Sequence, residues 1–252
     1  MNTETLDRMR ALRLYGMHDA FKANLETSLK ESMTPDQFIH YLVTSESDDR
    51  RNRAVARAIK QANFRYKASL EDIDYTIDRG LDKNQVHRLA ALDFVKEHKD
   101  LFITGSTGTG KRYLATALGY QACQDSYRVM YVNTAKLMGQ LKLAKAKGTI
   151  LAELKRIERQ DLLILDDFGL QPFDSQARVA LLDIIEDRHQ KKSTIITSQI
   201  PVKEWYDVIG EKTIADAVLD RIVHHSLRVE LYGESLRRRK NKMDDKTENV
   251  YL

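Results

Sequence analysis

The stretch Leu101-Phe-Ile-Thr-Gly-Ser-Thr-Gly-Thr-Gly-Lys111 joins a short apolar run to three closely spaced glycines and a lysine, and a helix-forming segment follows. Glycine reaches backbone angles that other residues adopt only at a cost, so Gly105, Gly108 and Gly110 let the loop wrap its N–H groups around phosphate oxygens. The following helix adds unpaired N–H groups and the positive end of its dipole. The spacing G-x-x-x-x-G-K in this strand–loop–helix order predicts a P-loop, in which Lys111 contacts the β- and γ-phosphates of a nucleotide.

The predicted nucleotide contacts are the loop and the start of the helix after it: Gly105, Ser106, Thr107, Gly108, Thr109, Gly110, Lys111, Arg112 and Tyr113. Arg112 stands where a P-loop normally carries the Ser or Thr whose hydroxyl binds Mg²⁺. Arginine removes that ligand and adds a cation beside the metal site. Because the backbone contacts and Lys111 survive the change, we expect nucleotide binding to persist while metal affinity and turnover fall.

The composition is that of a helix-rich soluble protein, with 252 residues, 42% hydrophobic and 31% charged residues, and a net charge of +4. No window approaches eighteen consecutive apolar residues, and the N-terminus lacks the basic start and apolar core of a secretion signal. The single cysteine, Cys123, cannot form an internal disulfide, so packing is its expected role. These features predict a cytoplasmic protein without a membrane segment.

We expect a small all-helical domain over residues 1–66, because apolar residues recur at helical spacing from residue 4 to residue 63. Within it, Thr34-Pro-Asp-Gln37 predicts a new helix, with Thr as N-cap, Pro at the first position and Gln in the capping-box position. Residues 67–252 are then the nucleotide-binding domain, which begins with a helix over 83–96. Little chain remains after its last strand, so its C-terminal lid is expected to be reduced.

From residue 100 short apolar runs alternate with helices, which predicts an α/β fold with a mainly parallel five-stranded sheet flanked by helices. The five runs span residues 101–104, 129–133, 162–165, 194–197 and 227–231. Between the second and third runs, Gly148 is expected to divide a long segment into two helices. Ligands of such sheets bind at the carboxyl ends of the strands, where the candidate catalytic residues also fall.

Two carboxylates follow the third run, in Leu162-Leu-Ile-Leu-Asp-Asp167. Asp166 is placed to hold Mg²⁺ through its water shell, and Asp167 to orient or deprotonate an attacking water. After the fourth run, Ser198 or Gln199 could place a polar side chain between these carboxylates and the γ-phosphate. A strand that simply ends in turn-prone polar residues explains that pattern equally well.

Two arginines near the C-terminal end are further candidates. Arg221, in Asp220-Arg-Ile222, could reach the γ-phosphate of a neighbouring subunit and supply charge in trans. A surface ion pair between Asp220 and Arg221 is the alternative. Arg237, which ends Gly233-Glu-Ser-Leu-Arg237, could contact the nucleotide of its own chain.

Two basic stretches predict contact with the phosphate backbone of double-stranded DNA, with solvated helix faces as the alternative. From residue 50 to residue 67 there are seven Lys or Arg and no acid, and the expected contacts are Arg50, Arg51, Arg53, Arg57 and Lys60. The first helix after the second run is also free of acids, and its expected contacts are Lys142, Lys145 and Lys147.

Taken together, these motifs resemble the IstB-like ATPases, AAA+ helper proteins encoded beside the transposase in bacterial insertion sequences. The likeness covers nearly the whole chain, and the stretches that carry it are Leu12-Arg-Leu-Tyr-Gly-Met17, Phe102–Lys111, Leu163-Ile-Leu-Asp-Asp-Phe-Gly169, Ile196-Thr-Ser-Gln199, Leu219-Asp-Arg-Ile-Val-His-His-Ser226 and Gly233-Glu-Ser-Leu-Arg237. The last two stretches are shared with helicase loaders rather than with P-loop proteins at large. By resemblance, Arg221 is a trans arginine finger and Arg237 a second sensor.

The resemblance implies that ATP and Mg²⁺ are cofactors, and that ATP drives self-assembly on target DNA and its delivery to the transposase. Arg112 departs from the pattern, and Asp167 stands where most AAA+ proteins have Glu. Three functions stay open: an ATPase that licenses transposition, a nucleotide-gated DNA scaffold that scarcely hydrolyses ATP because of Arg112, and a loader of a replicative helicase.

Overall fold

The structure, a computed structural model, describes residues 1–27, 33–224 and 226–236. It divides into two compact units, Met1–Arg57 and Ala58–Leu252, and the division falls within one long helix, α3 (Pro35–Ala62). The C-terminal end of α3 belongs to the second unit, because Ala62 is fully buried in the core there. The domain boundary after residue 66, expected from the change in composition, stays a prediction.

The first unit consists of helices, as expected: α1 (Asn2–Ala11), α2 (Tyr15–Thr27) and the N-terminal part of α3. The capping box that opens α3 is formed, since the Thr34 N–H donates to Oε1 of Gln37 at 2.9 Å and the Gln37 N–H donates to the Thr34 hydroxyl at 3.3 Å. Buried Ala20, Phe21 and Leu42 form the small core of this unit.

Gly16 allows α2 and α3 to approach each other closely, because a Cβ at this position would lie 2.3 Å from the carbonyl oxygen of Ser45. The carboxylate of Glu46 on α3 accepts hydrogen bonds from the N–H groups of Gly16 at 2.9 Å and Met17 at 3.2 Å, and from Nε of Arg50 at 2.6 Å. Burial alone would raise the pKa of Glu46, but these donors lower it overall. Gly16 is therefore needed for the close packing of α2 against α3.

The second unit contains a five-stranded sheet in the order β2-β3-β4-β1-β5, and every neighbouring pair is parallel. Its strands are β1 (Asp100–Gly105), β2 (Val129–Asn133), β3 (Leu162–Phe168), β4 (Ser193–Ser198) and β5 (Ser226–Leu231). Its helices are α4 (Lys83–Ala90), α5 (Asp93–Lys96), α6 (Lys111–Gln124), α7 (Thr134–Ala146), α8 (Ile150–Glu158), α9 (Ser175–Arg188), the short 3₁₀ helix η2 (Val202–Glu204), α10 (Trp205–Ile209) and α11 (Lys212–Val223). The predicted α/β fold and its five strands are confirmed.

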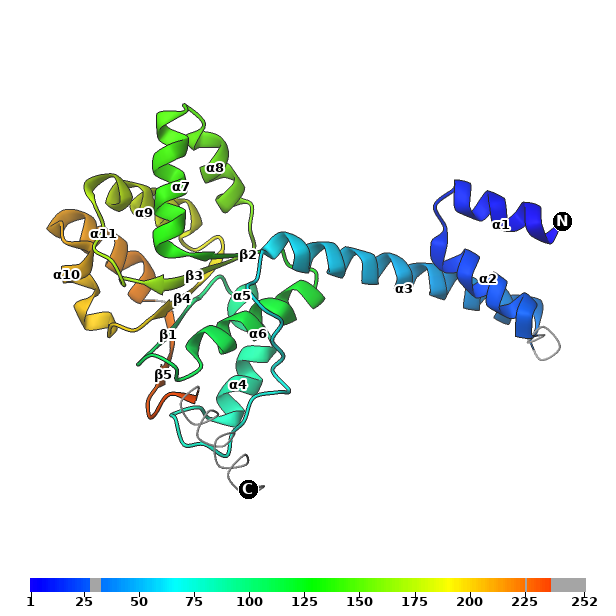
Figure 1. The fold of residues 1–252 in the computed structure, drawn as a ribbon, viewed down its shortest axis with the longest axis horizontal. Helices are drawn as coiled ribbons and strands as arrows, with labels where there is room; N and C mark the ends of the chain where they lie inside the picture. Colours follow the sequence, from blue (N-terminus) through cyan, green and yellow to red (C-terminus); the bar gives the residue numbers. More distant parts are fainter. Residues whose placement is uncertain (28–32, 225, 237–252) are drawn as a thin grey trace, which may run out of the picture. The chain divides into compact units, whose positions relative to one another are not determined.

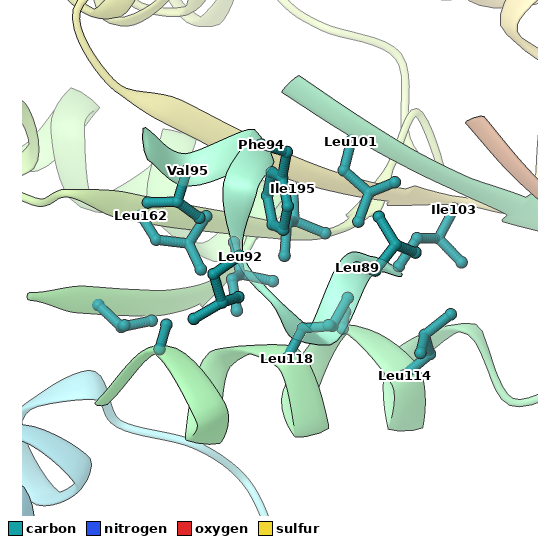
Figure 2. Close-up of a cluster of buried hydrophobic side chains, with 14 of the residues drawn as sticks. Leu89, Leu92, Phe94, Val95, Leu101, Ile103, Leu114, Leu118, Leu162 and Ile195 are labelled. Carbon is teal, nitrogen blue, oxygen red and sulfur yellow. The ribbon is translucent and has the colours of Figure 1, made fainter. Parts of the chain in front are cut away.

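Helices cover both faces of the sheet, with α4, α5 and α6 on one face and α7 to α11 on the other (Figure 1). Alternate strand residues point to opposite faces, so in β1 Leu101 and Ile103 pack toward α6 while Phe102 packs against Trp205 on the other face. Figure 2 shows the α6 side, where apolar residues of α4, α5 and α6 meet residues of β1, β3 and β4. This double-sided burial explains why the strands are almost continuously apolar.

Two local expectations have different outcomes. The single helix expected over 83–96 is interrupted, because Leu92 takes a left-handed conformation (φ +57°) between α4 and α5. Gly148, with φ +71°, does divide the segment after β2 into α7 and α8. Within the described residues, no helix is long and apolar enough to cross a membrane.

Candidate functional site

The predicted P-loop connects β1 to α6 at the carboxyl edge of the sheet. Gly105, Gly108 and Gly110 have φ values of +141°, +87° and +98°, which confirms that the turn needs glycine at these positions. Nζ of Lys111 donates to the carbonyl oxygen of Ser106 at 2.7 Å, so the ammonium group lies across the loop. Burial lowers the pKa of Lys111, partly offset by the two carboxylates of β3.

Asp166 and Asp167 end the regular part of β3, and both reach Arg112 at the start of α6. Nε of Arg112 lies 2.6 Å from Oδ2 of Asp166, and Nη2 lies 2.5 Å from Oδ2 of Asp167. Consecutive residues of a regular strand point to opposite faces, but the pairing of β3 with β4 shifts between Leu165 and Phe168, and Asp167 has φ +57°. This left-handed residue turns the second carboxylate to the same cation as the first.

Asp166 is surrounded by donors and is only 1% exposed. Its Oδ1 accepts from the hydroxyl of Thr197 at 2.6 Å, and its Oδ2 accepts from the hydroxyl of Tyr131 as well as from Arg112. Burial and the hydrogen bond to Asp166 raise the pKa of Tyr131 well above its usual range, so this residue is a fixed donor at neutral pH. Nδ2 of Asn133 donates to Asp167 at 3.1 Å.

The end of β4 contributes two polar side chains, but not the pair that was expected. Gln199 is in place, since its Oε1 accepts from the hydroxyl of Thr107 in the P-loop at 2.7 Å. Ser198 is not brought to the site, because its hydroxyl donates to the carbonyl oxygen of Phe168 at 2.8 Å and accepts from the Ile200 N–H. Thr197 takes the place that was expected for Ser198, because strand alternation puts the Thr197 side chain on the same face as Asp166.

These groups line a cavity of about 480 Å³, a size typical of small-ligand sites. One side is formed by the P-loop together with Asp166, Asp167, Thr197 and Gln199. The other side is formed by Tyr66, Arg79, Tyr113 and Leu236. The rings of Tyr66 and Tyr113 stack with centroids 6.3 Å apart and planes 20° apart, so the cavity joins a phosphate-binding end to an aromatic end.

The segment after β5 packs onto the P-loop. The Leu236 N–H donates to the carbonyl oxygen of Gly108 at 3.0 Å, and a Cβ at Gly108 would lie 2.1 Å from the hydroxyl of Ser235. Gly108 is therefore needed for this contact as well as for the loop itself. Arg237, expected to act as a second sensor, lies outside the described residues.

Comparison with known proteins decides the family. The model of the IstB-like ATP binding protein family matches residues 7–244. The chain belongs to this family. A relative from Sinorhizobium fredii, y4pL, named as an insertion sequence ATP-binding protein, is 41% identical over 93% of this chain and 96% of its own length. The IS21 ATP-binding protein of Pseudomonas aeruginosa is 30% identical over 84% of this chain and 80% of its own length.

Solved structures show the same fold. DnaI superposes with a TM-score of 0.57 and 24% identity over 70% of this chain and 93% of that chain. The AMPPCP-bound DnaA of Aquifex aeolicus superposes with a TM-score of 0.58 and 23% identity over 75% of this chain and 58% of that chain. The α/β unit of this IstB-like protein thus has the fold of these structures, in a family described as ATP-binding.

Sequence patterns did not indicate Arg79, a further cation that lines the P-loop cavity. Arg79 is buried, and its Nη1 donates to the carbonyl oxygen of Thr109 at 3.2 Å while Nη2 donates to that of Asp74 at 3.1 Å. It braces the P-loop from the segment that precedes α4. Because no familiar motif surrounds Arg79, only its spatial position identifies it.

The proposed trans residue, Arg221, does not line the cavity of its own chain. Its Nη1 donates to the carbonyl oxygen of Ala217 at 2.7 Å, and its Nη2 lies 3.5 Å from Glu186 of α9. Asp220 instead pairs with His224, so the alternative pairing of Asp220 with Arg221 is not seen in the described part of the chain. A role in trans stays a prediction for this IstB-like protein.

Several residues of the predicted DNA surfaces are paired with acids in the structure. Arg50 contacts Glu46 at 2.6 Å, Arg53 contacts Asp49 at 2.8 Å, and Lys142 contacts Asp174 at 3.1 Å. The partners of Arg50 and Arg53 lie one turn earlier on α3, just before the acid-free stretch begins. Arg51, Arg57, Lys60, Lys145 and Lys147 are exposed. Their contact with DNA stays a prediction.

The arrangement does not fit Mg²⁺ at Asp166, the residue expected from the sequence to hold this ion through its water shell. Magnesium requires near-octahedral oxygen ligands, usually including several waters. Asp166 is buried and already accepts from Arg112, Tyr131 and Thr197. Among the residues that the structure describes, no group of three or more His, Cys, Asp or Glu could hold a metal ion.

Proposed function

We propose that this IstB-like protein is a nucleotide-gated DNA-binding helper of transposition. Copies with bound ATP assemble on double-stranded DNA in the bacterial cytoplasm and deliver that DNA to the transposase of their insertion sequence. The observation that carries the proposal is the cavity between the P-loop and the ends of β3 and β4, in a chain whose relatives are named as insertion sequence ATP-binding proteins.

Binding of ATP, rather than its turnover, is proposed to control the protein. An attacking water must be oriented or deprotonated by a free carboxylate, and Asp167 is instead held by Arg112 at 2.5 Å and by Asn133 at 3.1 Å. These donors occupy lone pairs of the carboxylate that would otherwise accept a hydrogen bond or a proton from the water. Hydrolysis is therefore slow in the wild-type protein.

A second candidate is an ATPase whose turnover drives each cycle of assembly. It is supported by Lys111, Asp166, Asp167 and Gln199, which all lie at the cavity. The two candidates differ in whether phosphate release accompanies assembly on DNA.

The exposed basic residues support the DNA part of the proposal. The side chains of Arg50 and Arg53 remain 59% and 43% exposed in their ion pairs, and Lys142 remains 58% exposed. The Arg53–Asp49 and Lys142–Asp174 pairs lie at the surface, where ion pairs contribute little to stability, so DNA phosphates can replace these carboxylate partners at little cost. Each phosphate contact releases a counterion and adds to the salt dependence of binding.

Particle size by electron microscopy with duplex DNA, with and without ATP, tests this function. Assemblies that form only with both DNA and ATP are expected, and equal assembly without ATP would contradict gating. Changing Lys142, Lys145 and Lys147 together to Glu is expected to weaken duplex binding and flatten its salt dependence. A matched charge reversal of Lys83, Lys96 and Lys99, on the opposite face of the sheet, serves as the control. If the two triple variants bind DNA equally, α7 does not contact DNA.

A further inference from the structure

Arg112 stands where the metal-binding Ser or Thr of a P-loop is normally found, and its guanidinium spans the two carboxylates of β3. Nε contacts Asp166 at 2.6 Å and Nη2 contacts Asp167 at 2.5 Å, so separate nitrogens of one planar group reach separate acids. A lysine ammonium is a single point and cannot reproduce this two-point geometry. Asp166, Tyr131 and Asp167 outweigh the effect of burial and raise the pKa of Arg112, which stays charged at all relevant pH values.

The carboxylates are satisfied without a metal. A carboxylate offers about four acceptor positions, and Asp166 uses three of them within the protein while only 1% of the residue is exposed. Asp167 accepts from both Arg112 and Asn133. A divalent ion would have to displace the guanidinium from its contacts with both carboxylates.

The charges at the phosphate end are balanced by the protein itself. Lys111 and Arg112 are cations, and Asp166 and Asp167 are anions, all at the same cavity. In an ordinary P-loop site the metal offsets the repulsion between these acids and the triphosphate. Here the Arg112 side chain is 26% exposed and lines the cavity, and Nη1 has no partner among the described residues, so it can donate to a phosphate oxygen.

We propose that Arg112 is a built-in replacement for Mg²⁺, and that this protein binds ATP without a divalent metal ion. The inference deepens the proposed function, on which it rests for the nucleotide. A helper controlled by ATP binding needs only a stable complex, and the tethered guanidinium provides the counter-charge for it.

The wild-type protein gives the primary test, through the Kd of ATP by calorimetry in excess EDTA and again in excess Mg²⁺. The two Kd values are expected to agree within about threefold, because Arg112 supplies the counter-charge in both buffers. A threefold ratio corresponds to well under 1.4 kcal/mol. Tightening by Mg²⁺ of about tenfold or more would overturn the proposal.

The variant Arg112→Thr restores the usual hydroxyl and removes the cation. In EDTA its ATP affinity is expected to fall by about tenfold or more, and Mg²⁺ is expected to restore it. Arg112→Lys keeps the charge without the two-point contact. Its ATP affinity in EDTA is expected to lie between those of the wild type and Arg112→Thr. Arg228→Thr, which removes an exposed arginine of β5, is the matched control and should bind ATP equally well in both buffers. Equal metal dependence in all four proteins would contradict the proposal.

Thermal unfolding without nucleotide provides an independent readout. Arg112→Thr leaves two acids side by side, so Mg²⁺ alone is expected to raise its Tm while leaving the Tm of the wild type unchanged. A Tm of the wild type that rises with Mg²⁺ as much as that of the variant would count against the assigned role. Should Arg112→Thr fail to fold, the wild-type and Arg112→Lys measurements still decide. Metal-independent ATP binding without assembly on DNA would refute only the proposed function, whereas no ATP binding in either buffer would refute both.

Discussion

The hydroxyl of Thr197 donates to Oδ1 of Asp166 at 2.6 Å, and the Thr197 hydroxyl oxygen accepts from the backbone N–H of Asp167 at 3.2 Å. One side chain of β4 thus holds both acids of β3. Replacing Thr197 by Val keeps the shape but leaves a buried carboxylate oxygen and an N–H group without this partner. We expect the free energy of unfolding to fall by about 1–3 kcal/mol.

Urea unfolding of Thr197→Val and Thr197→Ser measures this contribution. The serine variant keeps the hydroxyl and is expected to lose less stability than the valine variant. If valine is tolerated as well as serine, the hydroxyl does not support the acids.

Turnover is expected to increase when Arg112 is replaced by Thr. The change frees Asp167 to act on water and supplies the missing hydroxyl. Phosphate release in Mg²⁺ with duplex DNA should therefore rise about tenfold or more, which corresponds to an activation free energy lower by about 1.4 kcal/mol. Arg228→Thr is the control and should release phosphate at the wild-type rate. Unchanged turnover in Arg112→Thr would favour the candidate in which the wild type is already a competent ATPase.

Arg221 is expected to act on the nucleotide of a neighbouring copy, since in its own chain it contacts Ala217 and Glu186 rather than the cavity. In the Arg112→Thr background, Arg221→Ala and Asp167→Asn should each reduce turnover by about a hundredfold or more. When the two variants are mixed in equal amounts, about a quarter of the sites should be active. A site is active only where a subunit with Asp167 lies next to a subunit with Arg221, and random assembly gives that pairing about a quarter of the time. A mixture as inactive as its components would exclude a trans role.

Asp100 is expected to make stability depend on pH. Burial raises its pKa from 3.8 to about 7, against the opposing effects of the Thr194 N–H and Arg188. Because the native pKa lies above the unfolded one, the contribution of this group to stability is fully present below about pH 4 and is lost as pH rises through 7. Asp100→Asn keeps an acceptor for Thr194 and cannot ionise.

Urea midpoints at pH 5 and pH 8 check this expectation. The decrease between the two pH values should be smaller in Asp100→Asn than in the wild type. An equal decrease in both proteins would assign the pH dependence to other groups.

Much of the fold could be predicted from the sequence because its signals are local. The glycine spacing indicated the P-loop, Thr34 and Gln37 indicated the start of α3, and five apolar runs indicated the five strands. The break at Leu92 could not be predicted, since no glycine or proline marks it and a leucine takes the left-handed conformation there.

The sequence by itself determined which residue types follow each strand, because backbone preference and apolar periodicity are properties of short segments. Only the tertiary structure decided which of them meet. Thr197 rather than Ser198 reaches Asp166 because of the face on which it lies in β4. Tyr131 reaches Asp166 from β2, the strand next to β3. Arg112 contacts both acids because the irregularity in β3 turns Asp167 to the same side as Asp166. Such contacts depend on strand register and on a left-handed backbone conformation at one aspartate, which no local pattern of residues encodes.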